Sequence, residues 1–337
     1  MTKYIELFSS KIFHWTLILI GVFLRLRAYL SNRSFWLDEV WVAVEVTTRS
    51  WKQLLNGDYM FKDLASPPIG FSLLTKLFVT CFGNNEMVFR LLPFVCGVLS
   101  IFLFYHLIKD RLENAMVSLG LSLFVLNPYL IYYSVEVKQY SCDLFFTLFL
   151  LNALIFLFTK TAKAWHLIMF GLISSLIMWI SNASLFMIAS SGVILFIFYF
   201  QRRDWKNIII MISIGLFWCC NYFFMNSIFL QDLLENESVR RSLAPFFIPH
   251  LISPWENVAW MVKTFVSQFQ DPMGLFLPVL AGMVFLWGVY TQMKKDAKFG
   301  ICLLLPIVLL CIAAALAKYP FRSRMIIFII PFYIIFI

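Results

Sequence analysis

The sequence predicts an all-α polytopic integral membrane protein, and three observations carry that prediction. Hydrophobic residues make up 61% of the 337 residues, whereas Asp, Glu, Lys and Arg together supply only 13%. A soluble domain needs roughly 25% charged residues to cover its surface. The apolar residues also gather in runs of about 20, the length of a membrane-spanning helix. Because hydrocarbon cannot satisfy the edge of an open sheet, each run should be helical.

The apolar runs predict a bundle of about ten spans, joined by short loops and by two long ones. We expect the spans near residues 12–30, 90–108, 115–133, 140–158, 166–181, 182–200, 208–230, 273–290, 300–317 and 325–337. No small-residue cleavage site follows the first run, so we interpret it as an uncleaved span and not as a signal peptide. The last run is short for a span. We therefore expect residues 1–337 to form a single membrane domain that is truncated at its C-terminal end.

The basic residues predict the orientation of the spans. With the N-terminus in the cytoplasm, the short cytoplasmic loops hold Lys109, Arg111, Lys160, Lys163, Arg202, Arg203, Lys206, Lys294, Lys295 and Lys298. Few acids oppose these bases, as the positive-inside rule requires. Two long loops, 31–89 and 231–272, and two short ones, 134–139 and 318–324, then lie on the outer face. We expect the function outside the membrane or at its outer surface.

Composition also excludes several kinds of site and partner. The net charge of +9 comes from scattered residues, and no basic segment is polar enough to follow a nucleic-acid backbone. Most of the seven cysteines fall inside apolar runs without CxxC spacing, so they predict neither a disulfide framework nor a zinc site. The four histidines form no metal triad. We expect no nucleic-acid partner, no metal and no cofactor.

An acidic pair, Asp38 and Glu39, stands where a helical stretch begins in the first outer loop. Val40, Val44, Trp51 and Leu55 then recur near helical spacing, which predicts a helix lying in the membrane interface. The simpler interpretation is that the acidic pair caps this helix, where the macrodipole stabilises a carboxylate. The alternative is a general base that faces the bilayer surface.

The same loop continues with a second helix start and a base. Ser66 can cap, and Pro67 can begin, an apolar helix that we expect to extend to about residue 82. Arg90 then opens the second span. Taken alone, Arg90 would be an anchor that snorkels to the headgroups.

A second group of ionisable residues surrounds the start of the fourth span. If that span begins near Glu136, then Glu136, Tyr140 and Asp143 share one helical face. Asp143 would lie about one turn inside the membrane, where an ionisable group is costly and usually faces a polar cavity. The alternative is a structural salt bridge between Lys138 and these acids.

Two later segments carry polar features on the outer side. Residues 254–270 predict an amphipathic helix with Ser253 in a capping box, either covering a cavity or anchoring in the interface. Its apolar face consists of Val258, Val262, Phe265, Val266 and Phe269. Arg322 and Arg324 then precede the last span, after Tyr319 and Pro320.

Together these motifs resemble the GT-C glycosyltransferases. The order is an Asp-Glu pair in the first outer loop, a Pro-Pro helix start, an Arg-Leu-x-Pro span start, Tyr-Ser-x-Glu-x-Lys-x-Tyr, and a late Tyr-Pro followed by Arg. Within that superfamily the chain is most similar to the bacterial branch that resembles protein O-mannosyltransferases and the lipid A aminoarabinose transferase. Many members have His or Lys immediately before Pro-Pro, where this chain has Ser66. The resemblance extends from about Arg25 to the end of the chain.

The resemblance implies transfer of a sugar from a polyprenyl-phosphate carrier, with inversion, to a glycan, lipid or protein acceptor. It also implies a bacterial inner membrane. Asp38 is our candidate base, because it is the acid best placed to meet a substrate at the outer surface, with Glu39 as a second catalytic carboxylate and Glu136 as a supporting one. The resemblance also implies that Tyr140 and Asp143 contact substrate. The candidate phosphate ligands are Arg90, Lys138, Arg322 and Arg324. Since cationic side chains can stabilise the leaving phosphate, a metal is not required.

The convergence of three distant residues follows from this scheme. Their loops share one side of the membrane, so we expect Asp38, Glu136 and Arg324 to meet in one cavity. The main alternative function is a flippase or transporter of lipid-linked sugars. A transporter should place its ionisable groups near the bilayer midplane, often in paired repeats, whereas here they cluster at the outer ends of spans.

Overall fold

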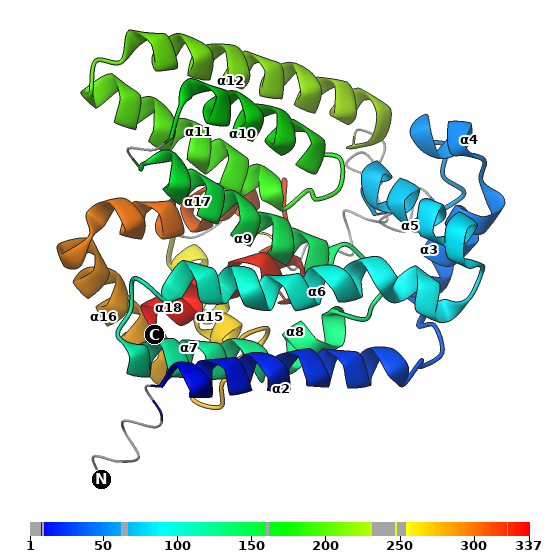
Figure 1. The fold of residues 1–337 in the computed structure, drawn as a ribbon, viewed down its shortest axis with the longest axis horizontal. Helices are drawn as coiled ribbons and strands as arrows, with labels where there is room; N and C mark the ends of the chain where they lie inside the picture. The colour runs from blue at the N-terminus through cyan, green and yellow to red at the C-terminus, as the bar shows by residue number, and fades with distance from the viewer. Residues whose placement is uncertain are drawn as a thin grey trace.

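The computed structural model describes residues 8, 10–61, 67–159, 162–230, 247, 254–321 and 323–337. Every regular element in these ranges is helical (Figure 1). Six of the helices are long and apolar enough to cross a membrane, judged by length and composition. They are α2 (Lys11–Leu30), α6 (Glu86–Ile108), α9 (Tyr140–Leu157), α11 (Ser184–Gln201), α12 (Trp205–Met225) and α17 (Ala297–Ala315). The prediction of an all-α polytopic membrane protein is confirmed.

The remaining predicted runs are also helical, although they are shorter or interrupted. They form α7 (Asn114–Val125), α8 (Pro128–Tyr133), α10 (Ala164–Ile177), α16 (Pro278–Lys295), and a final 3-10 segment η4 (Ser323–Ile329) that continues into α18 (Ile330–Phe336). A π-helical segment, η2 (Asn226–Leu230), extends α12. All ten predicted runs therefore have a helical counterpart.

The expectation of one continuous helix over residues 115–133 is wrong, because the chain breaks between α7 and α8. Pro128 has no N–H, and the residue before a proline avoids helical geometry. Asn127 starts the new helix, since its side-chain oxygen accepts the N–H of Leu130 at 2.9 Å. Its amide nitrogen donates to the carbonyls of Pro272 and Met273, at 3.2 and 2.9 Å. The break thus joins α8 to the turn after α15.

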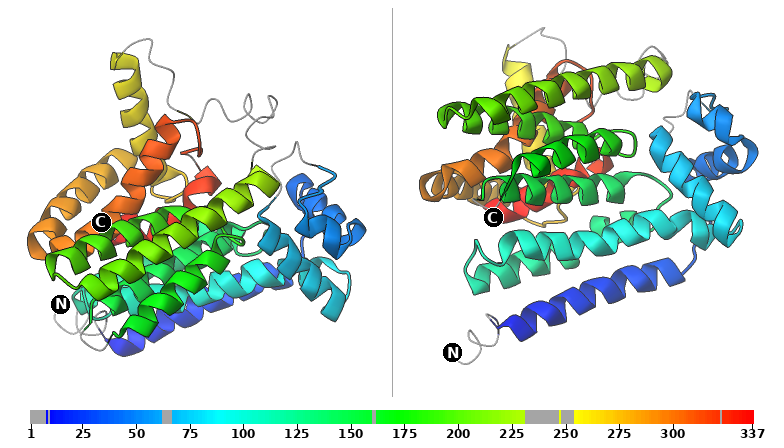
Figure 2. Two further views of the ribbon diagram at one scale, coloured as in Figure 1. Left: turned by 90° about the horizontal axis from the view of Figure 1, so that it is seen from above. Right: turned by 45° about the horizontal axis from the view of Figure 1, so that its top comes forward.

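Helix α9 is the central element of the bundle. It packs against α6 along most of its length, and also against α10, α11 and η4. The other helices surround it, with α2 and α7 on the far side of α6 (Figure 2). Because α9 contacts so many elements, its first residues lie where several helices meet.

A group of three short helices stands at one end of the bundle, opposite the N-terminus (Figure 1). It consists of α3 (Leu37–Thr48), α4 (Trp51–Leu55) and α5 (Ile69–Phe82). The prediction of one helix that carries Val40, Val44, Trp51 and Leu55 is wrong, because α3 ends at Thr48 and α4 begins at Trp51. The helix predicted after Pro67 is present and ends at residue 82 as expected, while Ser66 lies outside the described residues. A small core of Val42, Ala43, Val46, Phe71, Phe89, Cys96, Val137 and Cys142 ties this group to α6 and α9.

The close approach of α5 to the bundle depends on a glycine. Gly70 donates its N–H to the carbonyl of Trp179 at 2.7 Å. A β-carbon at this position would lie 2.7 Å from the same oxygen, which is closer than real contacts allow. A side chain at position 70 would push α5 away from the turn after α10.

Helix α15 (Pro254–Gln270) confirms the predicted amphipathic helix, but its apolar face is only partly covered. Phe269 is fully buried, whereas Val258 and Val262 are about half exposed. The N-terminal half of the helix extends away from the bundle (Figure 2, yellow). The C-terminal half of α15 packs against the bundle, whereas its role as cover of a cavity or as interfacial anchor stays a prediction, and the capping residue Ser253 lies outside the described residues.

Candidate active site

A buried ion pair fixes the start of α3. Arg90 of α6 donates from Nε and Nη2 to the two carboxylate oxygens of Glu39, at 3.1 and 2.9 Å. The backbone N–H groups of Trp36 and Val137 also donate to this carboxylate, each at 3.0 Å. Glu39 is therefore bonded by four donors and has no exposed surface. We call Glu39, Arg90 and the two backbone donors the Glu39 clamp.

The contacts of the Glu39 clamp give Glu39 and Arg90 structural roles. The third nitrogen of Arg90, Nη1, donates to the carbonyl of Arg33 at 2.5 Å, and the side chain is buried. No face of Arg90 is open to a phosphate, so the expectation that it binds the donor is not supported. The same holds for Glu39 as a catalytic group, because its lone pairs are already occupied. Both residues instead join the first loop to α6 and to the turn before α9.

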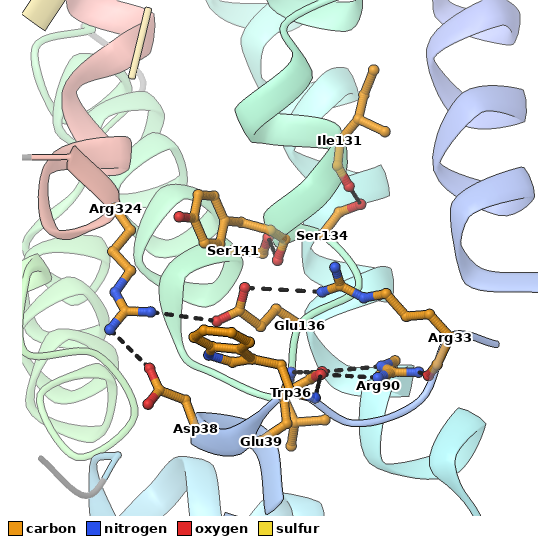
Figure 3. A network of polar contacts seen from close by, with 12 residues as sticks. Arg33, Trp36, Asp38, Glu39, Arg90, Ile131, Ser134, Glu136, Ser141 and Arg324 are labelled. Atoms are coloured by element: carbon orange, nitrogen blue, oxygen red, sulfur yellow. Dashed lines mark hydrogen bonds and ion pairs between the residues drawn. The ribbon is translucent and has the colours of Figure 1, made fainter. Parts of the chain in front are cut away.

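Asp38, next to the clamp, meets the last helical segment. An oxygen of its carboxylate lies 2.8 Å from Nη2 of Arg324 in η4. Nη1 of Arg324 lies 3.9 Å from Glu136, so one guanidinium stands between two carboxylates (Figure 3). The predicted convergence of Asp38, Glu136 and Arg324 is confirmed. Asp38 keeps 16% of its side chain exposed, in contrast to the enclosed Glu39.

Glu136 reaches this cluster from the turn between α8 and α9. The expectation that Glu136, Tyr140 and Asp143 share one helical face is wrong, because α9 begins only at Tyr140. Tyr140 nevertheless lies at the cluster, with its ring centre 5.7 Å from the guanidinium carbon of Arg324. Lys138 is buried in the same turn and interacts electrostatically with Asp38, Glu136 and Arg324.

Asp143 has partners on a different element. Its carboxylate accepts the hydroxyl of Ser181 at 2.5 Å and a backbone hydrogen bond from Ala183. These contacts hold the turn between α10 and α11 against α9. These bonds give no support to the expectation that Asp143 contacts substrate. An acid inside the membrane needs polar partners, and Asp143 finds them in Ser181 and Ala183 of this turn.

The sequence analysis missed Arg33. Its Nη2 lies 4.0 Å from Glu136, and its guanidinium stacks 4.0 Å from the ring centre of Tyr132. Arg33 had a detectable signal, since it is a base shortly before the acidic pair in a loop expected at the site. Arg322, which was predicted beside Arg324, lies outside the described residues.

The charges of the cluster sum to a surplus of bases. Arg33, Arg90, Lys138 and Arg324 oppose Asp38, Glu39 and Glu136. Burial raises the pKa of Glu136 to about 7, with Glu39 and Asp38 adding to the rise and the arginines opposing it. Burial also lowers the pKa of Lys138 to about 8. The cluster is therefore suited to an anion.

The raised pKa of Glu136 predicts a dependence of stability on pH. The unfolded chain releases this proton near pH 4.5, whereas the folded protein holds it until about pH 7. The folded state binds more protons between these values, so this stabilising contribution is full below pH 4.5 and is lost as pH rises through 7. We expect the thermal midpoint in detergent to fall across this window, and to fall less in Glu136→Gln.

An exposed acid provides the matched control for this measurement. Glu113 precedes α7 and is exposed, without a side-chain capping bond. Glu113→Gln should retain the pH dependence of the unmodified protein. Equal slopes in Glu136→Gln and Glu113→Gln would show that Glu136 titrates in the ordinary range.

Across the described ranges, no three His, Cys, Asp or Glu side chains are grouped so that they could hold a metal ion. The seven cysteines are free.

Two comparisons with known proteins bear on this site. Residues 66–224 match the sequence model of the dolichyl-phosphate-mannose-protein mannosyltransferase family. Among solved structures, the chain is similar to ArnT from Cupriavidus metallidurans in the apo state, with a TM-score of 0.54 and 14% identity. That alignment covers 97% of this chain and 59% of the ArnT chain, so this chain spans about 59% of its length. No curated protein matches the chain at a significant level.

The comparisons confirm the resemblance that the motifs indicated. The segment matched by the family model contains Glu136 and Lys138, and lies between Asp38 and Arg324 in the sequence. The likeness to ArnT covers nearly the whole chain and shows a shared polytopic GT-C fold. The cluster at the end of the bundle therefore belongs to a scaffold of the GT-C type.

Proposed function

We propose that this membrane protein of the GT-C fold is a glycosyltransferase that moves a sugar from a polyprenyl-phosphate carrier to an acceptor hydroxyl or amine. The observation that carries the proposal is the contact of Arg324 with both Asp38 and Glu136, which assembles a base and a phosphate ligand from opposite ends of the chain. The match to a mannosyltransferase family supports it. We place the reaction at the outer face of a bacterial inner membrane.

The proposed reaction is a direct displacement that inverts the anomeric carbon. The acceptor oxygen or nitrogen attacks that carbon and forms the new bond, while the bond from the carbon to the phosphate oxygen breaks. Asp38 takes the proton of the acceptor, as a general base. The polyprenyl phosphate leaves with an additional negative charge, which Arg324 stabilises.

Asp38 is available for this role only if the phosphate competes for Arg324. A phosphate beside Arg324 replaces the carboxylate as its partner, because a guanidinium can bind phosphate through two parallel donors, whereas Asp38 contacts Nη2 and Nη1 faces Glu136. The displaced Asp38 then faces the acceptor. Lys138 and Arg33 supply further positive charge, and Glu136 and Tyr140 line the sugar side. We propose that these bases hold the phosphate without a divalent ion, and Arg322 remains a candidate.

Incubation of the purified protein with polyprenyl-phosphate sugars tests the proposal. Carriers bearing mannose, glucose, galactose or aminoarabinose are supplied with membrane extract as acceptor, and released polyprenyl phosphate is measured. We expect release with at least one sugar, dependent on the acceptor. Absence of release from every carrier would reject the transferase.

Substitution of Arg324 separates a phosphate ligand from a membrane anchor. Arg324→Ala should lower transfer by about 10², because a charge-assisted pair to a buried anion is worth roughly 2–5 kcal/mol. Arg324→Lys should recover little of this loss, since lysine lacks the two parallel donors. The measurement is the initial rate of transfer at saturating acceptor.

Arg202 serves as the control for an anchoring arginine. It caps the C-terminal end of α11, is exposed, and stacks with its guanidinium carbon 4.0 Å from the ring centre of Phe198. Arg202→Ala and Arg202→Lys should transfer sugar at the normal rate. If Arg324→Lys were as active as the unmodified protein, anchoring would explain Arg324 and the phosphate role would fail.

A flippase of lipid-linked sugars is the second candidate function. The location of the charges favours the transferase, because Asp38, Arg90 and Arg324 stand at or near the starts of helical segments, toward the end of the bundle. A transporter places such groups near the bilayer midplane. Reconstituted vesicles distinguish the two: a flippase would move a fluorescent lipid-linked sugar between leaflets without releasing polyprenyl phosphate.

A further inference from the structure

Trp36 combines a fixed backbone with an exposed side chain. Its N–H donates to Glu39 at 3.0 Å, and its carbonyl accepts the N–H groups of Glu39 and Val40 at 2.9 and 3.0 Å. The residue is nevertheless 57% exposed. Within the described ranges, its indole has no hydrogen bond and no ring contact. The Glu39 clamp thus holds the backbone of a residue whose side chain contributes little to the fold.

The neighbouring aromatic residue points the other way. The ring of Phe35 packs edge-on against Phe89 at 5.6 Å and lies 5.0 Å from the guanidinium carbon of Arg90. Phe35 therefore supplies the apolar contact that this segment needs. Trp36 is turned out of the core, so its indole contributes little buried apolar surface to the fold.

The direction of the indole relates it to the site. In the view of Figure 3, the indole of Trp36 lies between the carboxylates of Asp38 and Glu136. Trp36 is also two residues from Asp38, on the same rigid helix start. An exposed aromatic side chain therefore belongs to the same helix start as the carboxylate that we propose to take the proton.

We propose that Trp36 is a binding residue for the sugar of the donor, and that the indole stacks on the C–H face of a pyranose ring. The face of an indole is negative, whereas ring C–H groups carry partial positive charge, so the two attract when water is expelled. The inference rests on the proposed function and adds a substrate class: a pyranose with an uninterrupted C–H face. The hydroxyls at the ring edge remain free to meet Glu136.

Anchoring in the headgroup region is the competing role for an exposed tryptophan. Trp51 provides the matched control, because it begins α4 in the same helical group and is 42% exposed. Its ring contacts Lys76, with the amine 5.7 Å from the ring centre, and not the acidic cluster. An anchor effect should appear equally at both positions.

Fluorine NMR of protein labelled with 5-fluorotryptophan gives a direct readout. Trp36→Phe and Trp51→Phe each remove one resonance and so assign it. The labelled protein is titrated with geranyl phosphate, either free or joined to mannose, glucose, galactose or aminoarabinose. We expect the Trp36 resonance to shift with at least one sugar-bearing lipid and not with geranyl phosphate, while the Trp51 resonance stays unchanged.

Kinetics of the same variants give a second test. Trp36→Ala should raise the KM for the donor by about two- to tenfold, Trp36→Phe should recover most of this loss, and Trp51→Ala should have no effect. A Trp36 resonance that responds equally to lipids with and without sugar, or to none of them, overturns the proposal. If the proposed transferase function were wrong but Trp36 did bind the sugar, no sugar would be released, whereas the Trp36 resonance would still shift with the sugar-bearing lipid.

Discussion

Asp38→Asn is expected to lower sugar transfer by about 10² to 10⁴ while the protein remains folded. Asparagine keeps the shape of the side chain but cannot accept the proton of the acceptor. The fold should persist, because the Glu39 clamp and not Asp38 fixes the start of α3. The initial rate of transfer and the thermal midpoint are measured on the same preparation.

Asp58 is the control acid for this substitution. It lies after α4, is half exposed, and its carboxylate stands 3.7 Å from Arg49, so it is also an aspartate paired with arginine. Asp58→Asn should leave the rate within about twofold, as expected for a surface substitution away from the reaction. Near-normal transfer by Asp38→Asn would remove this carboxylate from the mechanism.

Glu39→Gln should cause the largest loss of stability among single substitutions at the site. The change leaves Arg90 buried without its counter-ion, and breaking one partner of a buried pair costs roughly 3–5 kcal/mol. The glutamine side chain also has a single acceptor oxygen, whereas Arg90 now donates to both carboxylate oxygens of Glu39. We expect a lower thermal midpoint and a smaller yield of folded protein in detergent.

A double variant distinguishes two effects of the Glu39 clamp: the cost of leaving one buried charge unpaired, and the positioning of the first loop. Glu39→Leu combined with Arg90→Met removes both charges and should recover part of the stability. It should not recover transfer, because the N–H groups of Trp36 and Val137 lose their acceptor and the two loops lose their register. A stable double variant with normal transfer would show that the clamp does not position the site.

The sequence predicted those features that depend on local pattern. Apolar runs predicted the helices, and Pro67 followed by an apolar stretch predicted the end of α5 at residue 82. The same patterns could not predict the partners of the charged residues. Arg90 was interpreted as a phosphate ligand because its only visible property was a base at a span start, whereas its pairing with Glu39 depends on how α3 lies against α6.

Predictions for the candidate site were wrong where the chain forms a short irregular turn in place of an expected helix. Extending the fourth span back to Glu136 put Asp143 on the same face as Glu136. In the structure, the turn before α9 directs Glu136 to Arg324, while Asp143 caps the turn at Ser181. The position of Arg33 before the acidic pair indicated a base near the site, but its partners Tyr132 and Glu136 are distant in sequence and could not be predicted.

The wide separation of Asp38 and Arg324 along the chain sets the order of events during biosynthesis. Glu39 and Arg90 can pair as soon as α6 has entered the membrane, since only the group of short helices lies between them. Asp38 must wait for η4, the last segment to reach the translocon among those that form the cluster. The contact between Asp38 and Arg324 therefore forms only after η4 has been inserted, later than the Glu39 clamp.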